Sequence, residues 1–431
     1  MSQELKSGSG TARKLLQSGI IFSAASFLTG LGNYAFQAII GRLLKEHGEY
    51  GLANSTFVFM GLLGLPLAIA TTAVTHYIAR FNFSGDDARL QGLLGGCRKF
   101  LFRFTIAGSA LAVVLIKPLS DFFNFPRTGL MFIALACVLA GLWGAFATAL
   151  CQGMAWFKRL ALIGLLGVCL RLAFGGFIVM KYPAAETAVL ATGFALLSNL
   201  VLLFWKKDLS RPSQAISPWN REFVQFLIVA AACVGGGYCF TQGDMLVAKR
   251  FFSNTELDAY SCAERLAAAL PIVVAPLLTV LFTHRSGQRH GDALREQLKL
   301  LGLYTMGLIC GAISLFVLRN FCVKLIFGRP APEAAAMIAQ LAMTMVFVGL
   351  LQALAMWALA SRWLKIALLY GGLGLAYWIT LLCLGKSPED LLRVMPVTAG
   401  IAFGAVFLIW LVAMRGHKTE TLKSDAASLD G

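Results

Sequence analysis

Residues 129–157 read GLMFIALACVLAGLWGAFATALCQGMAWF, a stretch without a single charged side chain. An α-helix needs about 20 apolar residues to cross the ~30 Å hydrocarbon core of a bilayer, so this stretch is long enough to span it. The chain contains eleven more long apolar stretches, separated by short charged connectors. The chain is therefore predicted to fold inside a membrane and to work within it or across it.

The predicted spans are Leu15–Ile40, Gly51–Ala79, Phe104–Ile116, Gly129–Phe157, Leu160–Met180, Thr187–Trp205, Phe223–Gly243, Leu266–Thr283, Leu300–Leu318, Ala334–Ser361, Ile366–Gly385 and Val394–Met414. Phe104–Ile116 is short, and we expect its helix to begin near Lys99. Backbone exposed to lipid must satisfy its own hydrogen bonds, and the short alternating segments of a barrel are missing from the sequence. The predicted fold class is all-α, with about twelve transmembrane helices.

The distribution of basic residues predicts the topology. Lys and Arg gather in cytoplasmic loops of membrane proteins. With an inside N-terminus, 23 of the 37 basic residues fall in inner loops and tails, 12 fall in outer loops and two lie within spans. Both termini are therefore predicted to be cytoplasmic, in a multi-pass protein of the inner cell membrane.

The two halves of the chain resemble each other. A shift of 210 residues places Tyr50 on Tyr260 and Pro66 on Pro276, and FKRLALIG at 157–164 resembles WLKIALLY at 363–370. Because both halves begin inside, they are predicted to form two parallel six-helix lobes around a central cleft, as in transporters that rock two repeats around a midplane site. The predicted divisions are a cytoplasmic tail over 1–14, an N-lobe over 15–205, a cytoplasmic linker over 206–220, a C-lobe over 221–414 and a cytoplasmic tail over 415–431.

Composition and motifs exclude several functions. The net charge of +16 reflects basic inner loops that face anionic lipid, and no nucleic-acid partner is expected. The ten cysteines show no CxxC spacing and no His at metal-ligand spacing, so neither a metal nor a disulfide framework is predicted. The sequence has no phosphate-binding GxxxxGK[ST] motif and no GxSxG motif, and its outer loops are too short for a catalytic domain. We expect no enzyme activity, no catalytic residues and no cofactor.

Ionisable residues inside spans are costly, which makes them candidates for function. Asp244, Glu264 and Arg265 enter the seventh and eighth spans from the outer side, and Arg171 lies in the fifth. Two interpretations remain open for the first group: an Asp244–Arg265 ion pair between helices, or a charged patch that lines the outer part of the cleft. The uncharged polar residues in spans are Asn33, Gln37, Asn54, Gln152, Asn199, Gln242, Gln340 and Gln352. Helix–helix contacts are the expected role of most of them, while Asn33 and Gln37 are assigned to the substrate site.

The segment QGDMLVAKRFFSNTELDAYSCAER, residues 242–265, resembles the seventh span and the start of the eighth in Wzx-type polysaccharide and O-antigen flippases. AIIGRLLKEHGEYGLAN, residues 38–54, is similar to their join between the first two spans. Together with the twelve-span layout, this resemblance indicates the multidrug/oligosaccharidyl-lipid/polysaccharide exporter superfamily.

The resemblance implies a flippase that moves an undecaprenyl-pyrophosphate-linked oligosaccharide from the inner to the outer leaflet by alternating access. Its implied partners are this cargo, membrane lipids, and the polymerase and chain-length proteins of polysaccharide export. Arg265 and Arg171 are the implied cations for the pyrophosphate, and Asp244 and Glu264 are predicted to couple transport to an ion. Related lipid II flippases carry arginines in spans one, two and eight. Arg265 fits the last of these, but its counterpart in the first half is Ser55, which argues against lipid II as the cargo.

Two other functions remain as alternatives. A cation-coupled drug or metabolite exporter of the same superfamily is expected to carry an acidic residue in an early span of the N-lobe, and the first two predicted spans have none. The other alternative is a non-transporting membrane subunit of a polysaccharide assembly complex.

Overall fold

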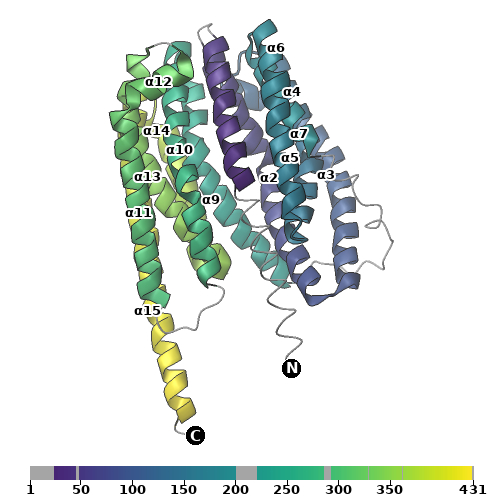
Figure 1. The fold of residues 1–431 in the computed structure, drawn as a ribbon, viewed down its shortest axis with the longest axis vertical. Coiled ribbons are helices and arrows are strands. Elements are labelled where there is room, and N and C mark those ends of the chain that lie inside the picture. The colour runs from purple at the N-terminus through teal and green to yellow at the C-terminus, as the bar shows by residue number, and fades with distance from the viewer. Residues whose placement is uncertain are drawn as a thin grey trace. The chain divides into compact units, whose positions relative to one another are not determined.

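The computed structural model of the chain describes residues 24–44, 48–199, 221–285, 293–328, 330–361 and 363–429. Within these ranges, every segment of regular structure is a helix (Figure 1). Each of the twelve predicted spans coincides, wholly or in part, with a described helix. The prediction of an all-α membrane fold is confirmed.

The helices divide into two compact units, with the boundary between Leu227 and Ile228. After a helix over residues 24–43, the first unit contains α2 Glu49–Ser84, α3 Asp87–Phe122, α4 Thr128–Gly153, α5 Phe157–Leu170, the π-helix η1 Arg171–Gly175, α6 Gly176–Lys181 and α7 Ala185–Ser198. α4 lies at its centre, where it packs against α2 on one side and α7 on another. The predicted linker over 206–220 lies outside the described residues.

The start of α3 differs from the prediction. The helix begins at Asp87, a dozen residues before Lys99, and the side chain of Asp86 caps it by accepting a hydrogen bond from the backbone N–H of Arg89 at 3.0 Å. Charged residues break the apolar pattern of its first turns, which hid this part of the helix from a search for apolar runs. Further along, Phe102 and Val114 are exposed, as expected of a helix that faces lipid.

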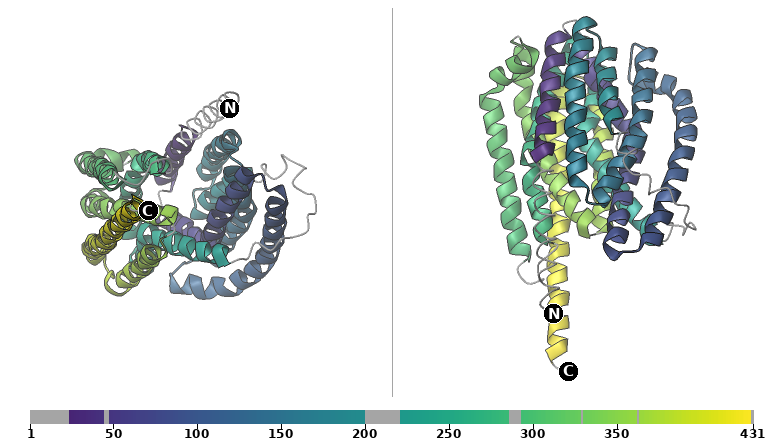
Figure 2. Two further views of the ribbon diagram at one scale, coloured as in Figure 1. Left: turned by 90° about the horizontal axis from the view of Figure 1, so that it is seen from below. Right: turned by 45° about the vertical axis from the view of Figure 1, so that its right-hand side comes forward.

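The second unit begins within α9 Arg221–Phe251 and continues with α10 Asn254–Arg285, α11 Ala293–Val317, α12 Arg319–Phe327, α13 Pro332–Ser361, α14 Leu364–Leu384 and α15 Pro388–Leu429. α13 is its central helix and packs against α10, α11, α14 and α15. α15 runs on through the predicted C-terminal tail and projects beyond the other helices of its unit (Figure 2).

The length and composition of the helices fit a multi-pass membrane protein. Eight helices of the described ranges are long and apolar enough to cross a membrane, and a ninth is formed if Leu301–Val317 and Arg319–Phe327, bent by 73°, count as one broken span. Large apolar side chains such as Ile401 and Val412 stay exposed along these helices. In a bilayer these side chains meet lipid, so their exposure carries no cost.

One close helix contact in the second unit depends on glycine. A Cβ atom added to Gly374 of α14 would lie 2.7 Å from the Cα atom of Gly236 in α9, and 2.8 Å from its carbonyl oxygen. The two backbones therefore approach as closely as in the small-residue contacts of other membrane helices. A larger residue at this point requires the helices to separate.

Candidate functional site

Arg171 joins three helices of the first unit. The α-helical hydrogen bonds of α5 change to the wider π pattern at this residue, which begins η1. One guanidinium nitrogen donates to the side-chain oxygen of Asn33 at 2.9 Å, and the other donates to the hydroxyl of Thr192 at 2.9 Å. Asn33 belongs to the helix over 24–43 and Thr192 belongs to α7. π-turns inside helices occur often at functional sites.

Aromatic rings complete the surroundings of this guanidinium. Its central carbon lies 4.2 Å from the ring centroid of Phe36 and 5.5 Å from that of Phe57, which are cation–π distances. The hydroxyl of Thr192 donates to the carbonyl of Ala188 at 3.3 Å, so it is free to accept from Arg171. These four contacts, two hydrogen bonds and two rings, hold the guanidinium in place between the helices.

The predicted substrate residues of the first half thus fall into two groups. Arg171 and Asn33, 138 residues apart in the sequence, are in direct contact. Gln37 lies one turn beyond Asn33, but it is buried, and its side-chain oxygen accepts a hydrogen bond of 3.5 Å from the hydroxyl of Tyr50. Its contact therefore joins two helices, and Gln37 is not part of the Arg171 cluster.

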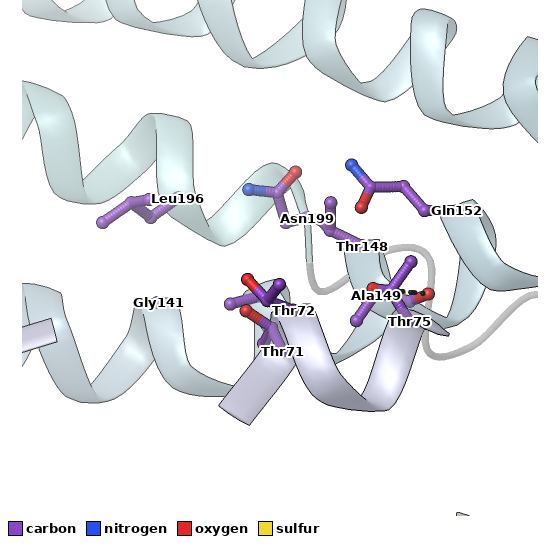
Figure 3. Close-up of a pocket in the computed structure, with 10 residues that line it drawn as sticks. Thr71, Thr72, Thr75, Gly141, Thr148, Ala149, Gln152, Leu196 and Asn199 are labelled. Carbon is purple, nitrogen blue, oxygen red and sulfur yellow. Dashed lines mark hydrogen bonds between the residues drawn. The ribbon is translucent and has the colours of Figure 1, made fainter. Parts of the chain in front are cut away.

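A polar cavity lies in the same unit, between the C-terminal halves of α2 and α4 and the end of α7. Its volume is about 450 Å³. The polar side chains around it are Thr71, Thr72, Thr75, Thr148, Gln152 and Asn199 (Figure 3). Gln152 and Asn199 were expected to make helix–helix contacts, and the threonines were not predicted to form a site. The sequence does indicate that these threonines share a helix face, because those of α2 are three and four residues apart and Thr148 is four residues before Gln152.

In the second unit, Asp244 is fully buried in α9. Its carboxylate accepts a hydrogen bond of 2.5 Å from the hydroxyl of Tyr260 in α10, and the sulfur of Met395 lies 3.4 Å from the same hydroxyl. The other carboxylate oxygen of Asp244 has no hydrogen-bond partner among the described residues. A buried carboxylate with an open acceptor position is equipped to take up a proton or a cation.

Glu264 and Arg265 follow on the next turn of α10. Glu264 is fully buried, and its carboxylate lies 3.3 Å from the Nε atom of Arg265, whose side chain is 17% exposed. The contacts of this group are Arg265 with Glu264 and Asp244 with Tyr260. The Asp244–Arg265 ion pair and the charged patch along the cleft both stay predictions. No cluster of three or more His, Cys, Asp or Glu suited to a metal ion occurs in the part of the chain that was described.

A third charged group lies at the start of α2 and was not predicted. Arg127, at the turn before α4, donates to both carboxylate oxygens of Glu186 at 2.9 and 2.8 Å and also contacts Glu49. The hydrogen bond to Glu186 is the main reason that the pKa of Arg127 is raised above its usual value, and Glu49 adds to it. Glu49 is buried and also accepts from the backbone N–H of Ala185 at 2.7 Å. The group therefore ties α2, α4 and α7 together at one end of the unit.

Comparison with known proteins shows which solved structures share this fold. No family model matches the sequence, and no curated protein matches it. The structure is similar to the lipid II flippase MurJ in an inward closed conformation, with a TM-score of 0.66 and 12% identity over 94% of this chain and 91% of that one. It is also similar to a multidrug resistance MATE family transporter of the MOP superfamily in an inward-facing conformation (TM-score 0.62, 12% identity, 92% and 99% covered). A mutant of the Vibrio cholerae MATE transporter VcmN is a further match (TM-score 0.59, 16% identity, 95% and 98% covered). The chain therefore has the fold of the transporters of the MOP superfamily.

Proposed function

We propose that this chain is a flippase for a lipid-linked oligosaccharide, moving it from the inner to the outer leaflet of the membrane by alternating access. The cargo class is an undecaprenyl-pyrophosphate-linked oligosaccharide for the cell surface. A sugar–pyrophosphate headgroup cannot cross hydrocarbon unaided, because each desolvated polar group costs several kcal/mol. The shared fold with a lipid II flippase supports a cargo of this kind, and so does the Wzx-type pattern of residues 242–265.

The observation that carries the proposal is the environment of Arg171. A charged guanidinium inside a span is expensive and marks a functional pathway by default. Here two neutral side chains, Asn33 and Thr192, aim it, and the ring of Phe36 covers one face. We propose that this guanidinium binds the pyrophosphate, since a guanidinium binds a phosphate better than an ammonium does because of its planar fork of donors.

The buried acids of the second unit supply the proposed coupling. Asp244 and Glu264 are both fully buried, and a proton or sodium ion that binds there changes the charge inside the membrane. Arg265, in contact with Glu264, is the second proposed cation for the pyrophosphate. In the proposal both termini and the 206–220 connector face the cytoplasm of the inner membrane.

A cation-coupled exporter of small molecules is the second candidate, and the similarity to MATE transporters favours it. Such an exporter needs an acidic residue early in the first half. α2 does begin with one, Glu49, but its carboxylate is engaged by Arg127 and by the backbone N–H of Ala185. The cation Arg171, which lies within a span of the same half, suits an anionic cargo.

Reconstitution separates the two candidates. Vesicles containing the purified protein receive a fluorescent undecaprenyl-pyrophosphate disaccharide, and a membrane-impermeant reductant measures how fast the label changes leaflet. We expect flipping well above the rate of protein-free vesicles, and no uptake of cationic dyes under an imposed proton or sodium gradient. Dye uptake together with a protein-free rate of lipid flipping would replace the flippase with the exporter.

A further inference from the structure

The cavity of the first unit is built to bind something polar and uncharged. Four threonine hydroxyls and two amides surround about 450 Å³ of space, and among the residues that the structure describes no charged side chain lines it. This volume lies within the roughly 300–1,000 Å³ typical of small-molecule sites. Small residues of α4 create the space, since Gly141, Ala145 and Ala149 line it alongside the threonines.

The hydrogen-bonding pattern of the cavity is specific. The hydroxyl of Thr72 donates to the carbonyl of Ala68 at 2.8 Å, and that of Thr148 donates to the carbonyl of Gly144 at 2.9 Å. With their protons used in this way, the threonine oxygens remain as acceptors. Figure 3 shows the threonines of α2 on one side of the cavity and the amide side chains of Asn199 and Gln152 across from them.

This pattern complements a sugar ring better than an ion. Each sugar hydroxyl donates one hydrogen bond and accepts others, and the cavity offers both acceptors and amide donors. Among the described lining residues an anion would lose its hydration without gaining a cation, and a cation would meet no carboxylate. The side chain of Leu196 adds an apolar wall for the C–H edge of a ring.

α7 connects the cavity to Arg171. Thr192, which accepts a hydrogen bond from Arg171, and Leu196, which lines the cavity, are four residues apart in α7 and so lie on the same side of the helix axis. At 1.5 Å per residue they are separated by about 6 Å along that axis. A phosphate bound at Arg171 therefore places the sugar attached to it within reach of the cavity.

We infer that this cavity receives a neutral sugar of the cargo while Arg171 binds the pyrophosphate. The inference rests on the proposed function and adds to it the substrate class recognised by α2, α4 and α7. It also implies that the protein selects headgroups by an uncharged sugar next to the phosphate, so that a uronic acid in this position binds more weakly.

The test compares binding of two probes to the full-length purified protein: undecaprenyl pyrophosphate, and the same lipid carrying an N-acetylglucosamine disaccharide. The ratio of the two affinities reports the contribution of the sugar. We expect the sugar to strengthen binding to the wild type. The double variant Thr72→Val with Thr148→Val should reduce this gain about five-fold for each hydroxyl, or roughly 25-fold in total. The matched control is Thr105→Val with Thr380→Val, two threonines outside the cavity that donate to their own helices in the same way.

A second variant guards against misfolding of the first. Ala145→Leu fills the cavity without removing a polar group, and it should abolish the gain from the sugar while leaving binding of the sugar-free lipid unchanged. An equal gain in the wild type and both variants, or no gain in the wild type, would overturn the inference. Flipping is measured separately in vesicles. If the sugar strengthens binding but the protein does not flip the lipid, the proposed function is wrong and the sugar site stands. If the protein flips the lipid but the variants keep the full gain in affinity from the sugar, the cavity is not the sugar site and the proposed function stands.

Discussion

Replacement of Arg171 by glutamine tests the proposed phosphate site directly. The structure sets the cost to stability: the variant loses hydrogen bonds to Asn33 and Thr192 and the cation–π contact with Phe36. Hydrogen bonds between membrane helices average ~0.6 kcal/mol, and the cation–π contact adds ~1 kcal/mol. The sum is about 2 kcal/mol, part of which glutamine recovers through its own amide, so the protein should remain folded.

The cost to transport should be larger. A hydrogen bond to a charged group is worth ~1.5–3 kcal/mol, and a guanidinium offers two to a phosphate. Losing both at the lower value removes about 3 kcal/mol, or roughly a hundred-fold in binding. Arg171→Lys keeps the charge but not the fork, and should retain an intermediate activity.

The assay is flipping of the labelled lipid-linked disaccharide in vesicles, with thermal unfolding measured on the same preparations. Arg319→Gln is the matched control, because the guanidinium of Arg319 also lies over an aromatic ring, 4.5 Å from the centroid of Phe316, at the start of α12. This control should flip at the wild-type rate. A folded Arg171→Gln variant that flips as fast as the wild type would refute the role of Arg171 in binding cargo.

Three further predictions concern stability and coupling. Gly374→Ala should destabilise the second unit by about 1–3 kcal/mol through overpacking. In the control Gly372→Ala the added Cβ atom meets no atom within 4 Å, so the temperature of thermal unfolding should not change. The same unfolding temperature in both variants would contradict the close contact. Arg127→Gln should lower stability by about 1 kcal/mol. The pKa of Arg127 is raised in the folded protein, so its charge stabilises the fold fully at any pH below the pKa of arginine in the unfolded chain. This stabilisation is lost only as the pH rises above that value. The difference from wild type should therefore stay constant between about pH 7 and pH 10, and a difference that disappears within this range would contradict the assignment. Flipping should slow when the membrane potential is collapsed, since one charge is worth ~2.3 kcal/mol per 100 mV, and Asp244→Asn or Glu264→Gln should each weaken that dependence. A wild type that flips equally fast with and without a potential or ion gradient would disprove the coupling.

The helices were predictable because the bilayer imposes a simple rule on the sequence. A run of about 20 apolar residues has few alternatives to a spanning helix. The rule failed at α3, where the helix begins at Asp87 in a segment interrupted by charge. The capping aspartate Asp86 was visible in the sequence, and a search for helix starts would have extended the prediction.

The contacts of the candidate site could be predicted only in part. The rule that polar residues in spans are candidates for function selected Arg171 and Asn33, but a sequence cannot show that residues 138 positions apart meet. The contact of Arg265 with Glu264, its neighbour in the chain, was not predicted, and the ion pair of Arg265 with Asp244 stays a prediction. The threonines of the cavity were missed because threonine is ordinary in membrane helices, and only their common face distinguishes them.

The resemblance between the two halves of the sequence extends to the contacts of two matched tyrosines. Tyr50 and Tyr260 are matched by the shift of 210 residues, and each donates a hydrogen bond to a polar side chain of the preceding helix. In the first unit that acceptor is neutral, Gln37, and in the second it is the carboxylate of Asp244.

The shift does not match Gln37 with Asp244, but it does pair Asn54 with Glu264, both fully buried, so at this position a neutral residue in the first unit matches an acid in the second. Arg171 has no such charged counterpart, since the shift places it on Leu381. In the proposed function an anionic headgroup binds at Arg171, and a proton or sodium ion binds at the buried acids of the second unit. The exchange of Asn54 for Glu264 is a difference between the halves that this division of roles requires, because only the acid can take up a proton.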